Sequence, residues 1–273
     1  MKSSTNGTCS AEHSEYLRRL KRKKRFISFM QLAILIGFIA VWEILGRLEI
    51  INTFIFSSPS RIASTISRLY GNGELLMHIG VTTFETVAGF IIGTILGTLI
   101  AVLMWWSKTL ARILDPYMVV LNALPKIALG PILIVWVGAG MEAIIVMALL
   151  ISTIVTIMTV LSGFNEISGE NHLLMRTLGA TRMQTFIKVV LPASVPTVMS
   201  ALKLSVGMSW VGVIVGEYLV SKAGLGYLIV YGGQVFKLDL VMASIAILCV
   251  LAALMYYAVA ALERWISRKV GRY

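Results

Sequence analysis

The sequence is dominated by long apolar runs, several of which reach or approach the roughly 20 residues that an α-helix needs to cross a membrane. The composition agrees, because 58% of the residues are hydrophobic and only 14% are charged, against about 45–50% and about 25% in soluble domains. Within a bilayer each segment must satisfy its own backbone polar groups, which favours helices. The sequence therefore predicts an all-α integral membrane protein with about six transmembrane helices.

The first predicted span follows a polar tail, residues 1–25. The basic block at residues 18–25 is typical of a cytoplasmic flank that contacts anionic lipid. A cleaved signal peptide is the alternative, but the apolar run exceeds the about 7–15 residues of such a peptide, and Trp42-Glu43 stands where cleavage would fall. The six predicted spans cover residues 26–46, 81–106, 113–137, 143–161, 195–220 and 240–262.

The loop after the first span, residues 47–80, is expected to lie outside the membrane core. Its apolar positions Ile62, Ile66 and Leu69 would share one helix face, which predicts a short helix over residues 61–70. The five later spans would form a core over residues 81–262.

The distribution of Lys and Arg predicts the orientation. With the N-terminus inside, the inner segments hold 17 of these residues and the outer segments hold 5. Because positive residues favour the cytoplasmic side, both termini, including the tail at 263–273, are expected in the cytoplasm of a bacterial cell. Topology thereby accounts for the net charge of +11, and no nucleic-acid partner is predicted.

The two cysteines, Cys9 and Cys249, lie in the polar tail and in an apolar run. Their positions give neither a disulfide framework nor a metal-binding spacing. We expect no metal site and no cofactor.

Small residues recur along one face of the second span. Gly89, Gly93, Gly97 and Ala101 follow one another at intervals of four, which predicts close approach of a neighbouring helix. Glu85 precedes this series by four residues and should therefore point into the bundle. It would serve either as a structural hydrogen-bonding group or as part of a pathway.

Other charged residues within or near the spans divide into two groups. Glu43 and Lys203 lie near span ends and are expected to extend toward the membrane interface. Lys126 lies between Pro125 and Pro131, and these prolines predict a broken or kinked helix, which is tolerated at depth when it lines a cavity. Residues 122–131 are therefore a candidate pathway element, unless Lys126 simply lies near a membrane face.

Trp210 and Glu217 are seven residues apart and share a face of the fifth span, beside Gly212 and Gly216. Such a stripe would contact a solute or mark the outer interface, where Trp is common.

Residues 164–192 form a polar stretch with an amphipathic pattern before Gly179. This pattern predicts a helix capped by Gly179, followed by a second short helix that Pro192 closes. Such a pair is suited to insert into a groove of a partner, and a plain connecting loop is the alternative.

Several segments resemble one family of transport proteins. Gly179-Ala180, Phe186 and Leu191-Pro192 look like the "EAA" loop of permease subunits in binding-protein-dependent ABC importers. Other segments resemble the nitrate, sulfonate and taurine branch of this family, and the likeness covers most of residues 60–265. These segments are Leu124–Pro131, Trp136–Gly138 and Trp210–Tyr227.

The resemblance implies a type I ABC permease-like fold in which residues 168–190 couple to a cleft on cytoplasmic ATPase subunits. It also implies ATP-driven alternating access, a second permease copy in a homodimer and an extracytoplasmic substrate-binding protein. The chain has no G-x-x-x-x-G-K-[ST] loop, so we expect it not to be an enzyme and hydrolysis to belong to the partner. The coupling residues so implied are Arg176, Thr177, Leu178, Gly179, Ala180, Phe186, Leu191 and Pro192.

The chain departs from the family pattern at the residues that name the loop. The glutamate and two alanines correspond here to Leu173, Leu174 and Met175. An acidic contact is therefore missing, and apolar packing is the expected docking mode, with Glu166 or Glu170 as alternative acidic groups.

The branch implies a small anion, such as a sulfonate, taurine or nitrate, as the solute. A vitamin precursor or heterocycle of the thiamine-pyrimidine or riboflavin type is the alternative. An ion-coupled secondary transporter is the alternative from another class, although the repeated halves common in such carriers are not visible here. The candidate pathway residues are Glu85, Asn122, Pro125, Lys126, Trp210 and Glu217.

Overall fold

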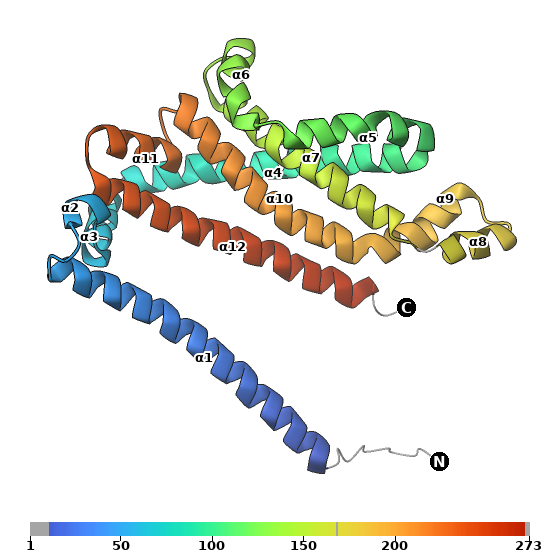
Figure 1. Ribbon diagram of the computed structural model, residues 1–273, viewed down its shortest axis with the longest axis horizontal. Helices are drawn as coiled ribbons and strands as arrows, with labels where there is room; N and C mark the ends of the chain where they lie inside the picture. The colour runs from blue at the N-terminus through green and yellow to red at the C-terminus, as the bar shows by residue number, and fades with distance from the viewer. Residues whose placement is uncertain (1–10, 168, 271–273) are drawn as a thin grey trace. The chain divides into compact units, whose positions relative to one another are not determined.

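The computed structural model describes residues 11–167 and 169–270, and every regular element within these ranges is a helix (Figure 1). Within them, five helices are long and apolar enough to cross a membrane, or up to six if one sharply bent pair counts as a span. The predicted all-α membrane fold is thereby confirmed. The chain divides into two units, Met1–Ala63 and Ser64–Tyr273.

The first unit is built on α1 (Ala11–Arg47), which continues without interruption from the basic block into the apolar run. Lys and Arg are good helix formers, which accounts for the helix beginning well before residue 26. Glu43 does not extend freely toward the interface as predicted. It accepts hydrogen bonds from Arg47 Nε at 2.7 Å and from the backbone N–H of Ser60 at 3.1 Å, and so it links α1 to the chain after α2 (Thr53–Phe56). Cys9 lies outside the described residues.

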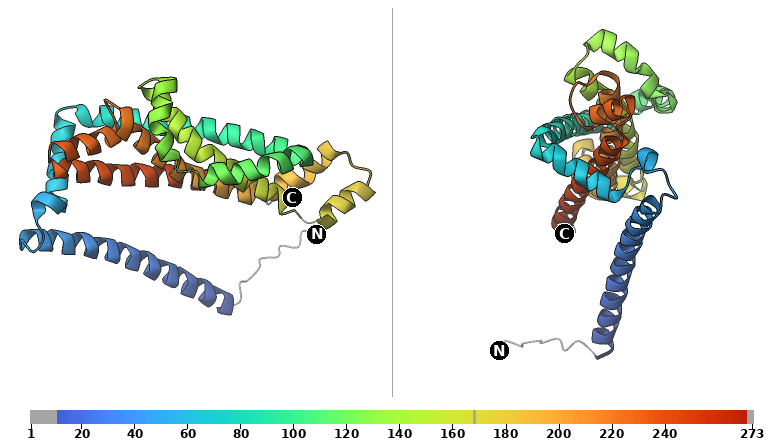
Figure 2. Two further views of the ribbon diagram at one scale, coloured as in Figure 1. Left: turned by 45° about the horizontal axis from the view of Figure 1, so that its top comes forward. Right: turned by 90° about the vertical axis from the view of Figure 1, so that its left-hand side faces the viewer.

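Three long helices form the centre of the second unit: α4 (Glu74–Trp106), α7 (Met141–Asn165) and α10 (Leu191–Val220). They run side by side in both views of Figure 2. The predicted small-residue face of α4 is buried and packs on α7. A Cβ added at Gly89 would lie 2.8 Å from the Cβ of Ala148, and one at Gly97 would lie 2.8 Å from the Cβ of Thr156. Only glycine permits this approach, which confirms the expected close packing.

Helix α10 approaches α7 as closely, and at some of the same residues. A Cβ at Gly212 would lie 2.5 Å from the Cα of Ala148, and one at Gly216 would lie 2.9 Å from the Cα of Ile144. Thr156 and Ser205 add a buried hydrogen bond of 2.5 Å between the two helices. Helix α7 is therefore packed tightly against both α4 and α10, which also contact each other.

The third predicted span is broken, as its prolines predict. Two residues separate helix α5 (Lys108–Ala123) from the 3₁₀ turn η1 (Lys126–Leu129), which leads into α6 (Gly130–Val137). The two arms are bent by 87°. Pro125 and Pro131 lie at the break and in the first turn of α6, where a missing backbone N–H is tolerated.

At one end of this unit, α3 (Pro59–Gly71) and α11 (Leu225–Gln234) pack with the start of α12 (Leu238–Val270). Helix α3 confirms the predicted short helix. The sequence analysis did not predict α11, because residues 221–239 were left as a connection between the last two predicted spans. The apolar cluster that joins these helices contains Leu69, Leu75, Leu225, Leu228 and Leu240.

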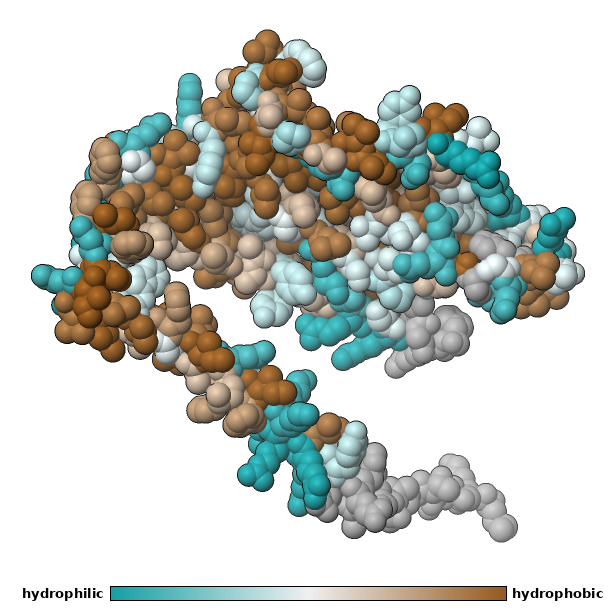
Figure 3. All heavy atoms as spheres, viewed as in Figure 1, coloured by the Kyte–Doolittle hydropathy of each residue, from teal (hydrophilic) through white to brown (hydrophobic). Residues whose placement is uncertain are grey.

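At the opposite end lie α8 (Gly169–Thr177), α9 (Arg182–Thr185), the α4–α5 connection and the C-terminal part of α12 (Figure 1). Figure 3 shows hydrophilic residues gathered toward α8 and α9, and apolar residues over the middle of the helices. The prediction that Pro192 closes the second short helix is wrong. A π-helical turn, Phe186–Val190, joins α9 to α10, so its wider hydrogen-bonding pattern carries the helix past the proline ring.

Candidate functional site

Helix α8 ends in a glycine cap, as the sequence predicted. Gly179 has a φ of +70°, its N–H donates to the Arg176 carbonyl at 3.1 Å, and the N–H of Ala180 donates to the Met175 carbonyl at 2.9 Å. This pair of bonds defines a Schellman motif, in which glycine adopts the left-handed conformation at no steric cost. The chain therefore reverses sharply between α8 and α9.

Helix α9 begins with a capping box. The Gln184 N–H donates to Thr181 Oγ1 at 3.2 Å, and the Thr181 N–H donates to Gln184 Oε1 at 2.8 Å. Both ends of the reversal at Gly179 are thereby defined by local hydrogen bonds. We call residues 169–190 the coupling segment.

The second half of the coupling segment is anchored to the bundle. The ring of Phe186 lies 4.8 Å from that of Trp105 and 5.7 Å from that of Phe164, centroid to centroid. The Arg182 guanidinium stands 5.5 Å from the ring centroids of Trp105 and Trp106 and donates to the Trp105 carbonyl at 3.1 Å. Phe186 is buried, so its role is to hold the segment in place rather than to face a partner.

The first half of the coupling segment is open to its surroundings. Leu178 is 71% exposed and Leu173 is 62% exposed, although both are apolar and lie outside the long spans. Arg176, Thr177 and Gly179 are exposed as well. The remaining predicted coupling residues differ, because Ala180 and Pro192 are half-buried, whereas Leu191 is exposed at the start of α10. Exposed leucines at a water-facing turn are typical of an interaction surface.

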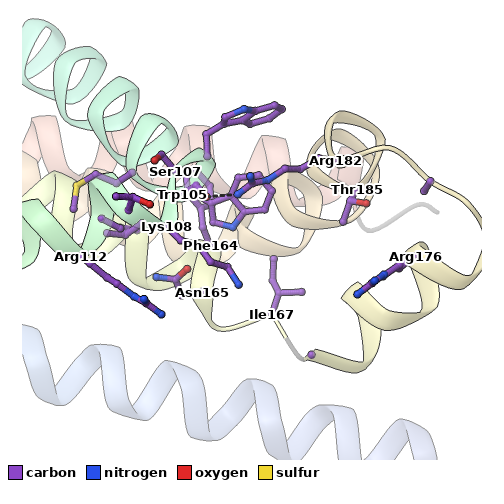
Figure 4. Close-up of a pocket in the computed structure, with 17 residues that line it drawn as sticks. Trp105, Ser107, Lys108, Arg112, Phe164, Asn165, Ile167, Arg176, Arg182 and Thr185 are labelled. Atoms are coloured by element: carbon purple, nitrogen blue, oxygen red, sulfur yellow. Dashed lines mark hydrogen bonds between the residues drawn. The ribbon is translucent and has the colours of Figure 1, made fainter.

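A pocket of about 1090 Å³ lies between the coupling segment and the α4–α5 corner (Figure 4). Trp105, Phe164 and Ile167 contribute its apolar wall, and Arg112 and Arg176 extend into it from opposite sides (Figure 4). The cationic side chains that line it are Lys108, Arg112, Arg176 and Arg182.

The break in the third span brings three predicted pathway residues together. Asn122 and Pro125 are exposed, and Lys126 is half-buried. Lys126 Nζ donates to the Asn122 carbonyl at 3.1 Å, so it satisfies a carbonyl that the end of α5 leaves free. The structure therefore gives Lys126 a local partner at the break.

Glu217 and Glu85 lie at the end of the bundle opposite the coupling segment, and both are buried. Glu217 Oε2 accepts a hydrogen bond of 2.5 Å from the N–H of Gly226. The neighbouring N–H groups of Leu225 and Gly224 donate to side chains of α4, to Thr82 Oγ1 at 2.7 Å and to His78 Nδ1 at 2.9 Å. Three consecutive donors at the start of α11 are thus satisfied by α4 and α10.

The glycines of this turn make room for the carboxyl group. A Cβ at Gly226 would lie 2.7 Å from Glu217 Oε2, and one at Gly224, which has a φ of +112°, would overlap the same carboxyl group. The Glu85 carboxyl lies beside that of Glu217 and is 2% exposed. In the part of the chain that the structure describes, Glu85 Oε2 and Glu217 Oε1 have no hydrogen-bond partner. We call Glu217, Glu85, Thr82 and His78 the carboxyl cluster.

Two side chains of this cluster, His78 and Thr82, were missed by the sequence analysis. They precede Glu85 by seven and three residues, so they share its helix face, and this spacing was the available signal. Their bonds to Gly224 and Leu225 cross more than 140 residues, and spacing alone gives no indication of such partners.

Trp210 and Lys203 lie elsewhere. Trp210 is 6% exposed and packs in an apolar cluster with Val206 and Val259, which disfavours the alternative in which it marks the outer interface. Lys203 does not extend freely to the interface, because its Nζ pairs with Glu263 Oε2 at 2.9 Å. The structure thus brings Glu85 and Glu217 together and leaves Trp210 and the proline break apart from them.

Solved structures define the class of this fold. The chain is similar to the inward-facing MetNI methionine ABC transporter with a TM-score of 0.59 and 21% identity, over 67% of this chain and 94% of that one. Residues 89–272 match the family described as binding-protein-dependent transport system inner membrane component, and the chain belongs to this family of ABC importer permeases.

Two curated relatives span nearly the whole chain. A putative aliphatic sulfonates transport permease of Bacillus subtilis is 28% identical over 264 residues, covering 97% of this chain and 96% of that protein. A taurine transport system permease of Escherichia coli is 24% identical over 260 residues, covering 92% and 94%. The resemblance drawn from the sequence motifs is thereby confirmed.

Proposed function

We propose that this permease carries a small organic anion of the sulfonate and taurine class across a bacterial cell membrane. The observation that carries the substrate class is the similarity along 97% of the chain to a permease named for aliphatic sulfonates. ATP hydrolysis in this proposal belongs to a separate subunit, since the chain has no phosphate-binding glycine loop.

The coupling segment is the proposed contact with that ATPase. Its free half exposes Leu173, Leu174 and Leu178, which stand at and just beyond the place of the usual acidic anchor. Its other half is fixed by Phe186 and Arg182 to the core. Exposed leucines on a rigidly mounted turn support docking by apolar packing in a groove of the partner.

The proposed orientation places the coupling segment, residues 1–25 and residues 263–273 in the cytoplasm. The excess of Lys and Arg on this side supports it. The loop at 47–80 would then face the outside, where a substrate-binding protein delivers the solute. A second copy of this chain would complete the pathway, and the exposed Val135 and Trp136 of α6 are available for such pairing.

Within the pathway, we assign two roles. The break at Asn122, Pro125 and Lys126 would line the route of the solute, because it combines exposed polar groups with irregular backbone. Glu85 and Glu217 would hold the outer end of the bundle together through α11. Trp210 would support the wall of the route from the apolar core behind it.

The coupling role is tested by Gly179→Asp. No atom lies within 4 Å of a Cβ at Gly179, so the substitution alters the turn without disturbing the core, and Asp tolerates the left-handed conformation. We expect the variant to reach the membrane and to lose both uptake and transport-coupled ATP hydrolysis. Gly71→Asp, which also meets open space but lies at the opposite end, is the matched control. Normal uptake by Gly179→Asp would exclude the proposed coupling.

The substrate class is tested in liposomes that contain the permease with its co-purifying ATPase and binding protein. ATP-dependent uptake of taurine or an alkanesulfonate is the expected result. Uptake of riboflavin or a pyrimidine in place of these would select the heterocycle alternative. Uptake by the permease alone, driven by a cation gradient, would select the secondary transporter instead.

A further inference from the structure

The pocket behind the coupling segment combines a cationic rim with an apolar wall. Its cationic side chains, Lys108, Arg112, Arg176 and Arg182, come from α5, α8 and α9. No Asp or Glu is present among the residues that line it, all of which lie in the described part of the chain. The pocket therefore has a strongly positive rim.

Three of these four cations are available to a ligand. Arg182 is engaged with Trp105 and its carbonyl. Lys108, Arg112 and Arg176, in contrast, form no ion pair with any side chain that the structure describes. Arg112 and Arg176 line the pocket from opposite sides (Figure 4), so both contribute to its positive charge.

The remaining wall is apolar and lies at the end of a membrane span. Trp105 and Trp106 end α4, which is long and apolar enough to cross a membrane, and Ile167 lies just beyond α7. Met104 and Phe164, each 1% exposed, are buried behind these side chains. Tryptophan and basic residues at this depth are typical of the headgroup region. The pocket thus offers an apolar wall toward the hydrocarbon and cations toward the water.

We propose that this pocket binds an anionic phospholipid, with its phosphate at Lys108 and Arg112, with Arg176 adding positive charge from the opposite wall, and with an acyl chain along Trp106 and Ile167. A phosphodiester anion matches guanidinium donors, and the volume of about 1090 Å³ accommodates a headgroup with part of its chains. A free phosphate would satisfy the cations but leave the apolar wall uncovered. The bound lipid would bridge the α4–α5 corner and the coupling segment.

Native mass spectrometry of the detergent-purified permease tests the proposal. Each Lys or Arg near a lipid headgroup contributes enough to change binding about fivefold. We expect phosphatidylglycerol to be retained over phosphatidylcholine, and Lys108→Gln combined with Arg112→Gln to lower its retention by about 25-fold. Arg68→Gln combined with Lys237→Gln removes two exposed charges at the opposite end and is the matched control. Millimolar glycerol phosphate should not displace the lipid.

Three results would overturn the proposal. They are equal retention of the two lipids by the unaltered protein, unchanged retention in the Lys108 and Arg112 variant, and displacement of the lipid by free glycerol phosphate. The first comparison uses no variant, so it stands even if the substituted protein fails to fold. Because the readout is lipid retention, a failed uptake assay for sulfonates would leave this inference unaffected.

Discussion

Gly212 and Gly207 lie on the same helix, and the structure predicts opposite consequences for alanine at the two positions. A Cβ at Gly212 would lie 2.5 Å from the Cα of Ala148, whereas ordinary contact begins near 3.4 Å. Helices α7 and α10 would have to separate locally by about 1 Å, and overpacking of this kind costs about 1–3 kcal/mol. At Gly207 nothing lies within 4 Å, so only the helix preference of Ala over Gly acts, worth about 1 kcal/mol in favour.

Because both substitutions gain the same helix preference, the difference between them isolates the packing. Gly212→Ala should be less stable than Gly207→Ala by about 1–3 kcal/mol. The assay is equilibrium unfolding of each purified variant by sodium dodecyl sulfate in mixed micelles, followed by far-ultraviolet circular dichroism. Equal unfolding free energies would refute the close packing of α10 against α7.

Because Gly89 of α4 and Gly212 of α10 both meet Ala148 of α7, this residue allows a rescue experiment. A Cβ at Gly89 meets only the Cβ of Ala148, at 2.8 Å, whereas at Gly212 the obstacle is the backbone of Ala148. Ala148→Gly should therefore restore the stability lost in Gly89→Ala and restore little of that lost in Gly212→Ala. Equal rescue of both variants would contradict the geometry.

Three further substitutions test other contacts. Glu217→Ala should lower the unfolding free energy by about 1–3 kcal/mol because it leaves a buried N–H of α11 without its acceptor, and Glu217→Gln should lower it less, as measured in the same detergent titration. Lys203→Met should lower the unfolding free energy by about 1–2 kcal/mol, between the values of surface and buried ion pairs, because it removes the pair with Glu263. A double-mutant cycle with Glu263→Gln that gives no coupling energy would contradict this ion pair. Phe186→Ala removes a buried ring and should speed hydrogen exchange in residues 182–190 at least tenfold while the exchange of α7 is unchanged; uniform loosening of both would contradict the anchoring role.

How far the sequence predicted the structure depended on the range of each interaction. The four-residue spacing of Gly89, Gly93 and Gly97 lies within one helix, and it was enough to predict the packing face of α4. The break at Pro125 and the cap at Gly179 were predicted for the same reason, since backbone chemistry decides each locally. These features required no knowledge of a distant partner.

The predictions that failed concern contacts between distant segments. Lys203 meets Glu263 across 60 residues, and His78 meets Gly224 across 146, so neither pairing is encoded in local spacing. The π turn after Phe186 is a different case. A proline ordinarily ends a helix, but here Phe186 is held by Trp105 and Phe164, and this anchoring keeps the segment helical.

The π turn has a mechanical consequence. Because it joins α9 to α10 without a break, Arg182–Val220 is a single helical rod of 39 residues, about 58 Å long at 1.5 Å per residue. Its N-terminal end belongs to the coupling segment. Near its C-terminal end, Glu217 accepts a hydrogen bond from the N–H of Gly226 in the first turn of α11. A displacement of the segment beside Arg182 would therefore be transmitted along the helix axis toward Glu217, and the π turn and Pro196 inside α10 are the places where the rod can bend.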